Sequence, residues 1–218
     1  MADPFVISST TLTPLRVANG VTQNARGTRD GALFTADWKQ ALVMEGRVWV
    51  ANMGSVTTPL TFLVTAANRP DAWLRMPSAT AVIPLRVEAV LEAAAGTVTE
   101  LDLRMAYNDI GNGTSSAATV GPVNYSPNNA GALTSAVIPR QLATADTTAE
   151  TTPISIHRVT FPLAQATGLV PYVDLFEPIV CPILIGPATL ELFIAATTTQ
   201  ATGFVQMIWA ELPSTMFT

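Results

Sequence analysis

The chain has 218 residues, of which 49% are hydrophobic and only 12% charged; its one Cys and one His exclude an internal disulfide and a cysteine-based zinc site. This length suits one domain, or two small ones, with a core that needs no metal. The net charge of −5 argues against nucleic acid as a partner, because phosphate binding needs clustered Lys and Arg, and no apolar run of about 18 residues predicts a membrane span.

Residues 1–40 are predicted to form an extended N-terminal arm. The Thr-rich stretch 8–14 favours extended backbone, because β-branched Thr disfavours helix and Pro fixes φ. The first residues lack the basic and apolar regions of a secretory signal, so none is expected. A structureless segment this long is uncommon inside a compact domain, so we expect it to pack on something. In a monomer it would be a loose tail, and in an assembly it would be an arm on a neighbouring subunit. Its predicted anchors are Phe5, Val6, Ile7 and Leu12.

Residues 41–218 are predicted to form a single β-sandwich domain. Short runs rich in Val, Thr and aromatic residues alternate with Gly, Pro and Asn, which is typical of strands separated by turns. Residues 200–203 are predicted to be the turn of a final hairpin. The predicted strands are residues 42–51, 55–66, 73–76, 154–161, 170–176, 179–185, 190–196 and 204–212, in addition to the two described next.

The clearest periodicity lies in residues 82–93 and 97–107. Alternate positions from Ile83 to Ala93, and from Leu101 to Tyr107, are apolar, whereas the charged residues fall on the opposite side. Such alternation indicates strands with one face in the core and one in water. With Gly96 between them, the two runs are expected to pair as an antiparallel hairpin with cross-strand charge pairs.

Residues 108–152 are predicted to be a long loop region, because their Gly, Ser, Asn and Thr clusters cannot bury an apolar face. The chain thus shows eight to ten short strands and no amphipathic helix longer than two turns. Sheets of this strand count tend to split into two layers, so we expect an all-β jelly roll or β-sandwich of about eight to ten antiparallel strands. The long loop favours a jelly-roll or Greek-key crossover.

Candidate catalytic groups have simpler structural interpretations. His157 lies mid-strand, on the side of Ser155 and Val159, and no serine stands in a Gly-x-Ser-x-Gly elbow, so a serine hydrolase is not expected. Paired carboxylates would suit a glycosidase, but alternation places them on the solvent face of the expected hairpin, interleaved with arginines. These carboxylates are Glu88, Glu92, Glu100 and Asp102.

Metal-binding and modification motifs are equally weak. The stretch 108–114 has oxygen-bearing side chains but lacks the acidic alternation of a calcium loop, so we expect a polar turn. The sequons at Asn112 and Asn124 are interpreted as chance matches in a chain rich in Ser and Thr. Cys181 is surrounded by apolar residues and is expected to be a buried small hydrophobe. No catalytic, cofactor or metal site is therefore predicted.

A surface with so few charges is easily desolvated and suits permanent contact with other subunits. Three segments, 54–62, 84–88 and 208–213, together with the arm and the Thr/Ala-rich strands, resemble virion structural proteins of tailed bacteriophages, of the jelly-roll decoration (cement) or capsid-associated type. The chain lacks the long helix expected of the common tailed-phage shell protein. The resemblance therefore implies a decoration protein rather than that shell subunit.

The resemblance implies a non-enzymatic protein that stabilises a viral capsid, assembled in the host cytoplasm. Its implied partners are the major capsid protein and its own copies, a trimer being favoured, with no nucleic acid and no membrane. One alternative is a jelly-roll major or minor capsid protein that forms the shell itself. Another is a receptor- or carbohydrate-binding fibre head, whose aromatic candidates are Tyr107 and Tyr125. A β-sandwich hydrolase using His157 is the third.

Overall fold

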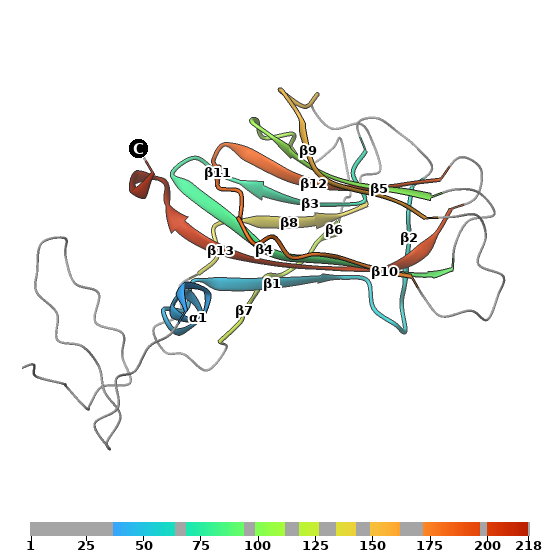
Figure 1. The fold of residues 1–218 in the computed structure, drawn as a ribbon, viewed down its shortest axis with the longest axis horizontal. Coiled ribbons are helices and arrows are strands. Elements are labelled where there is room, and N and C mark those ends of the chain that lie inside the picture. The colour runs from blue at the N-terminus through green and yellow to red at the C-terminus, as the bar shows by residue number, and fades with distance from the viewer. Residues whose placement is uncertain are drawn as a thin grey trace, which may run out of the picture.

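The computed structural model of the chain describes residues 37–63, 69–93, 99–111, 118–126, 134–142, 149–161, 172–196 and 200–217. In these ranges two antiparallel sheets pack face to face, which confirms the predicted all-β sandwich (Figure 1). The predicted arm anchors Phe5, Val6, Ile7 and Leu12 lie outside the described residues.

Five strands of the seven-stranded sheet run in the order β10-β4-β13-β1-β7, while β11 also pairs with β4 and β2 with β13. Their bounds are β1 Val48–Met53, β2 Leu60–Thr61, β4 Thr80–Ala93, β7 Val123–Asn124, β10 Tyr172–Phe176, β11 Leu184–Ile185 and β13 Thr202–Pro213.

The six-stranded sheet has the order β6-β8-β3-β12-β5-β9. Its strands are β3 Ala72–Met76, β5 Thr99–Ala106, β6 Ala118–Thr119, β8 Ile138–Gln141, β9 Ile154–Phe161 and β12 Ala188–Ala196. A helix, α1 (Trp38–Met44), precedes β1, and a short 3₁₀ turn, η1 (Ser214–Met216), follows β13.

The eight principal strands form a jelly roll. Taken in chain order as β1, β3, β4, β5, β9, β10, β12 and β13, the first pairs with the eighth, the second with the seventh, the third with the sixth and the fourth with the fifth. The pair β13–β4 then completes one sheet and β12–β5 the other. This nesting of pairs is the double Greek key in which a folded-over ribbon makes both layers.

The expected hairpin of residues 82–93 and 97–107 is wrong. β4 pairs with β13, β10 and β11, whereas β5 pairs with β12 and β9 in the opposite sheet. The chain therefore crosses between layers after Ala93 instead of turning back on itself. The charged residues pair along their own strands, as Arg86 with Glu88 and Arg104 with Asp102.

A β-bulge also divides the apolar face predicted for β4. Trp209 is opposite Pro84 and Ile208 is opposite Arg86, so Leu85 is the extra residue. A bulge shifts the alternation of a strand by one residue. Val87, Ala89 and Leu91 consequently point into the core between the sheets, while Ile83 and Leu85 join a second cluster on the outer face.

Only residues 48–51 of the predicted strand 42–51 are strand, because residues 42–44 belong to α1 and 45–47 form a turn. Asp37 caps α1, its carboxylate accepting a hydrogen bond from the Gln40 backbone N–H at 2.8 Å. Gly46, at φ 68°, reverses the chain before β1 begins at Val48. Leu42 and Val43 pack on the outer face of the seven-stranded sheet, a tertiary contact that strand propensity does not reveal.

Two loop predictions also need correction. The region 108–152 leaves β5 and returns to its neighbour β9 in the same sheet, so it is no crossover; it supplies β7 beside β1 and β8 beside β3. Residues 200–203 are no hairpin turn either, because β12 and β13 lie in different sheets and Thr202 and Gly203 belong to β13.

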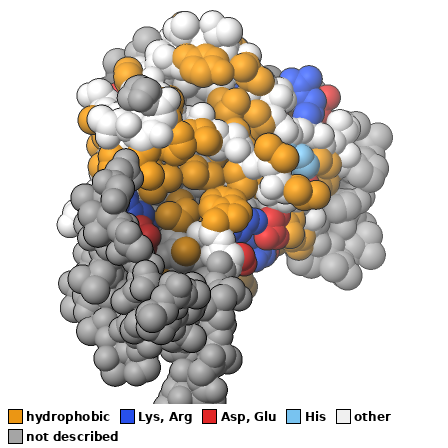
Figure 2. Space-filling view, turned by 60° about the vertical axis from the view of Figure 1, so that its left-hand side comes forward, with side chains coloured by type: hydrophobic (Ala, Val, Ile, Leu, Met, Phe, Trp, Pro, Cys, Tyr) orange, Lys and Arg blue, Asp and Glu red, His pale blue; other side chains and the backbone are white. Residues whose placement is uncertain are grey.

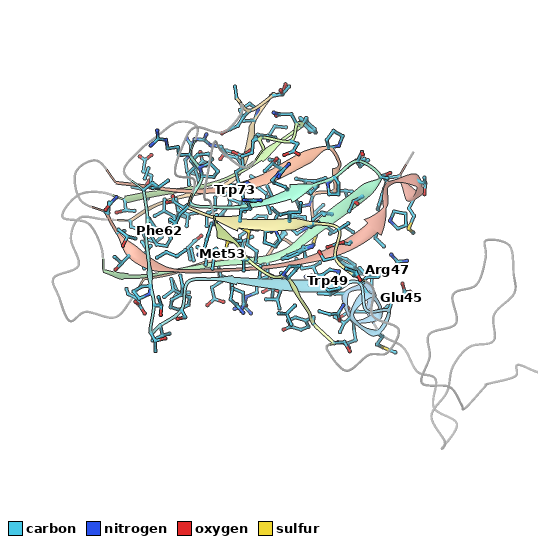
Figure 3. All side chains as sticks on the ribbon, turned by 180° about the vertical axis from the view of Figure 1, so that it is seen from behind. Glu45, Arg47, Trp49, Met53, Phe62 and Trp73 are labelled. Carbon is cyan, nitrogen blue, oxygen red and sulfur yellow. The ribbon has the colours of Figure 1, made fainter. Side chains whose placement is uncertain are left out.

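The main core fills the space between the sheets with Leu, Ile, Val, Met and aromatic side chains, among them Met53 and Phe62 (Figure 3). Both are fully buried. At the α1 end, Arg47 bonds Glu45 and the Glu211 carbonyl, which ties the turn after the helix to β13. The core thus leaves the two outer faces to carry any interaction site.

Candidate interaction surface

The outer face of the seven-stranded sheet is apolar. Ile83 and Leu85 from β4, Ile208 and Ala210 from β13 and Val48 from β1 form a buried cluster there. Leu42 and Val43 of α1 cover part of it, and Cys181 covers another part. An apolar outer face needs such a cover, because a sheet left bare would expose its side chains to water.

Beside this cover lies a set of exposed apolar side chains, here named the apical patch. Ile179 is 99% exposed and Val180 86% exposed, although both are large aliphatic residues. Contiguous exposed patches of this kind mark interaction sites, whereas single exposed side chains are ordinary. The apical patch consists of Ile179, Val180, Ile183, Ile185, Met216 and Phe217.

Pairing places β11 and the end of β13 at one end of the sandwich, and residues 179–183 lead directly into β11. β11, with Ile185, pairs with the start of β4 on one side, and the end of β13 pairs with it on the other. η1 follows β13 directly, and the Ser214 backbone N–H donates to the Ala79 carbonyl. In Figure 2, where this end comes forward, hydrophobic side chains gather in a broad area with charged groups toward its margins.

Proline explains why residues 179–185, predicted as one strand, leave most of their length unpaired. Pro178, Pro182 and Pro187 lack the N–H that a ladder requires, and only Leu184 and Ile185 pair. Cys181 is partly buried rather than fully buried as expected, and burial raises the pKa of its thiol. The missed signal in the sequence is a run from Pro178 to Pro187 without a polar or charged side chain.

The outer face of the six-stranded sheet is charged by contrast. Asp102 is buried and accepts hydrogen bonds from Arg104, Ser155 and Arg158. Burial alone would raise the pKa of Asp102, but these bonds outweigh it and lower the pKa below its ordinary value. The Arg104 guanidinium also lies 4.4 Å from the Phe193 ring centre and 3.4 Å from a Glu150 oxygen. Asp102 is therefore part of an ion-pair network and not of a solvated strand face.

Glu191 of β12 lies fully buried beside this network. Burial, and then the negative charge of Glu150, raise its pKa to about 9, so it carries a proton at neutral pH. Two carboxyls that share a site in this way resemble the acid–base pairs of hydrolases. A substrate must touch such a group, however, and the side chain of Glu191 is sealed from solvent. Neither Glu150 nor Glu191 was identified from the sequence, where each reads as an ordinary exposed acid.

Two further buried acids hold backbone in place. Asp71 accepts from the Leu63 and Ile194 N–H groups at 2.6 and 2.7 Å, and burial raises its pKa to about 7 despite these bonds. Glu211 accepts from the Trp209 indole and the Ala136 N–H at 2.9 Å each. Each carboxyl therefore connects segments of the jelly roll that are far apart in the sequence.

His157 joins the two sheets at one edge. Its Nε2 lies 2.9 Å from Asp174 of β10, and its ring packs 5.5 Å from Phe176. A bulge at Ile156 turns His157 inward while Ser155 faces outward to Asp102, so the shared face predicted for the two is wrong. The hydroxyl needed for a nucleophile–base pair thus lies on the opposite side of the strand.

The other sequence candidates are dispersed. Asp109, in the suspected calcium loop, binds Arg75, which lowers the pKa of Asp109. The Asn124 side chain donates to the Gly46 carbonyl and accepts from Ser126, so this sequon asparagine is engaged in a turn; Asn112 lies outside the described residues. Tyr107 and Tyr125 are exposed, but they follow strands of different sheets.

The described residues also line open hollows. Open depressions of about 350 Å³ include one lined by Trp49 and the Ser135–Pro139 region and one lined by Val56, Glu88 and Phe204. Among the described residues, no group of three or more His, Cys, Asp and Glu has a metal-binding arrangement. In the same part of the chain, no helix has the length and apolarity to cross a bilayer.

Comparison of the chain with known protein families, with curated proteins and with solved structures finds no match in any of the three. The candidate site is therefore defined by geometry alone, and its strongest element is the apical patch.

Proposed function

We propose that the chain is a non-enzymatic structural protein of a virus particle, which decorates and stabilises a capsid through contacts between subunits. The observation that carries this proposal is the apical patch, because two large aliphatic side chains almost wholly in water at one end of a rigid sandwich call for a protein partner. The jelly roll is one of the architectures from which viral capsid domains are built. Fold alone does not fix a function, so the patch and not the topology bears the argument.

The proposed mechanism is cross-bridging. Each subunit buries its weakly charged surface against the major capsid protein and against its own copies, and this adds to the free energy needed to separate them. The partners, the trimeric state and the location on the virion are parts of the same proposal. Burial of each large aliphatic side chain is worth roughly 1.5–3 kcal/mol, so a few repeated contacts produce a firm assembly.

Virion composition tests the proposal. Particles purified from the source that encodes the chain are expected to contain it at a fixed copy ratio to the main shell protein, measured by quantitative mass spectrometry. A chain lacking residues 2–20 should bind stripped particles more weakly than the full chain. Absence from purified virions would refute the structural role, and undiminished binding would refute the contribution of the arm.

A second candidate function is that the chain itself forms the shell. The complete eight-strand roll favours it, because this topology recurs in viral capsid domains. Expression of the chain alone distinguishes the two roles. A shell subunit is expected to give closed particles in electron micrographs, whereas a decoration protein gives small oligomers that bind preformed particles.

A further inference from the structure

We propose that the apical patch binds residues 5–12 of a second copy of this chain, so that subunits join head to tail through their N-terminal segments. The inference rests on the assembly role proposed above and names the partner of the patch. It concerns self-association, however, which is measured on the purified protein without any virion.

The patch has the chemistry of a surface that binds an uncharged segment. The sequence from Pro178 to Leu190 contains no charged residue, and Ile179 and Val180 project almost entirely into water. Its nearest described ion pair, Lys39 with Glu177 at 3.9 Å, lies at the border with α1. A charged partner would lose its hydration here without gaining a counter-charge, whereas an apolar partner loses nothing.

Residues 5–12 match these requirements. Their sequence is Phe-Val-Ile-Ser-Ser-Thr-Thr-Leu, and they lie in the longest uncharged run of the first 36 residues, between Asp3 and Arg16. Val, Ile and Thr favour extended backbone, which presents alternate side chains to a surface. Phe5 and Ile7, which share one face of such an extended segment, would then supply the area that Ile179 and Val180 need to bury.

The position of α1 shows where residues 13–36, which connect the segment to the sandwich, end. Asp37, which caps α1, is the first described residue, and Lys39 contacts Glu177 beside the patch. Residues 13–36 are 24 residues, which span up to roughly 80 Å when extended. A body of about 180 residues has a radius of gyration of only ~16 Å.

That reach favours a neighbouring copy over the chain's own patch. Its own patch begins beside α1, so docking there needs only a small part of the length of residues 13–36. Docking on a neighbour uses the full length of residues 13–36 to span the distance between two subunits. A head-to-tail contact of this type closes into a ring when the rotation between subunits permits, as in the proposed trimer.

Two charge variants and their mixture test the inference. Ile179→Asp with Val180→Asp places two negative charges in the patch, and Phe5→Asp with Ile7→Asp places two in the segment. Val56→Asp is the matched control, because Val56 is 71% exposed in the turn at the other end of β1 from α1. In analytical ultracentrifugation we expect the wild type and the control to associate equally and each double variant at least tenfold more weakly.

The mixture separates docking between copies from docking within one copy. The intact segment of the patch variant should bind the intact patch of the segment variant, so native mass spectrometry of isotope-labelled copies is expected to show a one-to-one heterodimer. Circular dichroism establishes that both variants are folded, and Ile179→Ser with Val180→Ser serves as a milder patch variant should the Asp pair unfold.

Four results would overturn the inference. They are a monomeric wild type, a patch variant that associates like the wild type, a mixture without heterodimer, and a monomer that binds phosphatidylcholine vesicles through Ile179 and Val180. The last would make a lipid surface the partner. Loss of virion binding with intact self-association, in contrast, would count only against the proposed function.

Discussion

The outer faces of the two sheets carry different kinds of side chain and expose them differently to water. The seven-stranded sheet covers its outer face with apolar groups from α1 and the 178–183 segment, and it continues into the exposed apical patch. The six-stranded sheet instead buries Asp102 and Glu191, while Arg104 is partly exposed and Arg158 is exposed at the edge. The first sheet thus ends in apolar side chains that lie in water, and the second buries carboxyl groups.

This contrast changes what the low charge content means. The chain has 11 Lys and Arg and 16 Asp and Glu, yet several of these are used inside one ion-pair network. The apical patch is correspondingly left without a charged side chain of its own. The proposed contacts therefore lie at an end of the molecule whose exposed apolar side chains have no charged residue among them.

The largest effect is expected from breaking the network. Arg104→Met removes the cation that lies 3.4 Å from Glu150 and 2.7 Å from Asp102. It also removes the contact with the Phe193 ring. We expect a loss of about 2–4 kcal/mol in the free energy of unfolding, measured with urea at neutral pH. Arg86→Met, on the other sheet, breaks a more exposed pair with Glu88 and should cost about 1 kcal/mol or less. Equal losses would remove the contrast between the faces.

Glu191→Gln tests the buried acid through pH. A carboxyl whose pKa rises on folding, here from 4.5 to about 9, keeps its proton only in the folded state. Its contribution is complete below pH 4.5 and is lost as pH rises toward about 9, by about 1.4 kcal/mol per pH unit. Gln mimics the protonated form and cannot titrate, so the variant should show a flatter dependence of unfolding free energy on pH.

Asp71→Asn provides the control for that experiment. The pKa of Asp71 rises from 3.8 to about 7, so its contribution is lost over a lower window and is constant above it. The Asp71 variant should therefore keep the wild-type slope between about pH 7 and about pH 9, where the Glu191 variant loses it. An unchanged slope in Glu191→Gln would mean that Glu191 is ionised in the folded protein.

A smaller effect is expected from the helix that covers the apolar face. Asp37→Ala removes the cap that accepts the Gln40 N–H, which typically costs about 1 kcal/mol. Asp37→Asn keeps an acceptor and should restore most of this stability. Because α1 covers Leu85 and Ile208, amide exchange in β4 and β13 should rise in the Ala variant and not in the Asn variant. Equal exchange in both would show that the helix is not needed as a cover.

The sequence predicts strands well where local alternation is strong. Residues 154–161 form β9 with the predicted bounds, and β3 differs from residues 73–76 by one residue. Sheet membership is not a local property, so a linker around Gly96 that suits a hairpin leads instead to the opposite layer. Within the described ranges, the nine strands of four or more residues fit the predicted eight to ten, whereas the four two-residue strands depend on tertiary pairing.

The candidate site was harder to predict because exposure itself depends on tertiary structure. From the sequence, Glu191 is expected to face solvent, whereas in the structure it is buried and its pKa is raised. The run 178–187 is expected to form a buried strand, but its prolines prevent most of it from pairing. Bulges at Leu85 and Ile156 shift alternation without a clear signal in the sequence. Proline spacing within an uncharged apolar run was the one clue to the patch that the sequence did contain.

The smallest effect on stability is expected at the patch itself. Ile179→Asp with Val180→Asp should change the unfolding free energy of the monomer by less than about 0.5 kcal/mol, because these side chains bury almost nothing within one copy. If copies associate through the patch, the wild-type melting temperature rises with protein concentration, since assembly stabilises the folded state by mass action. The variant should lose that concentration dependence while keeping the melting temperature of the dilute wild type. A large loss of stability at high dilution would instead mean that the patch packs within its own subunit, and the contrast between an exposed apolar face and a buried charged one would fail.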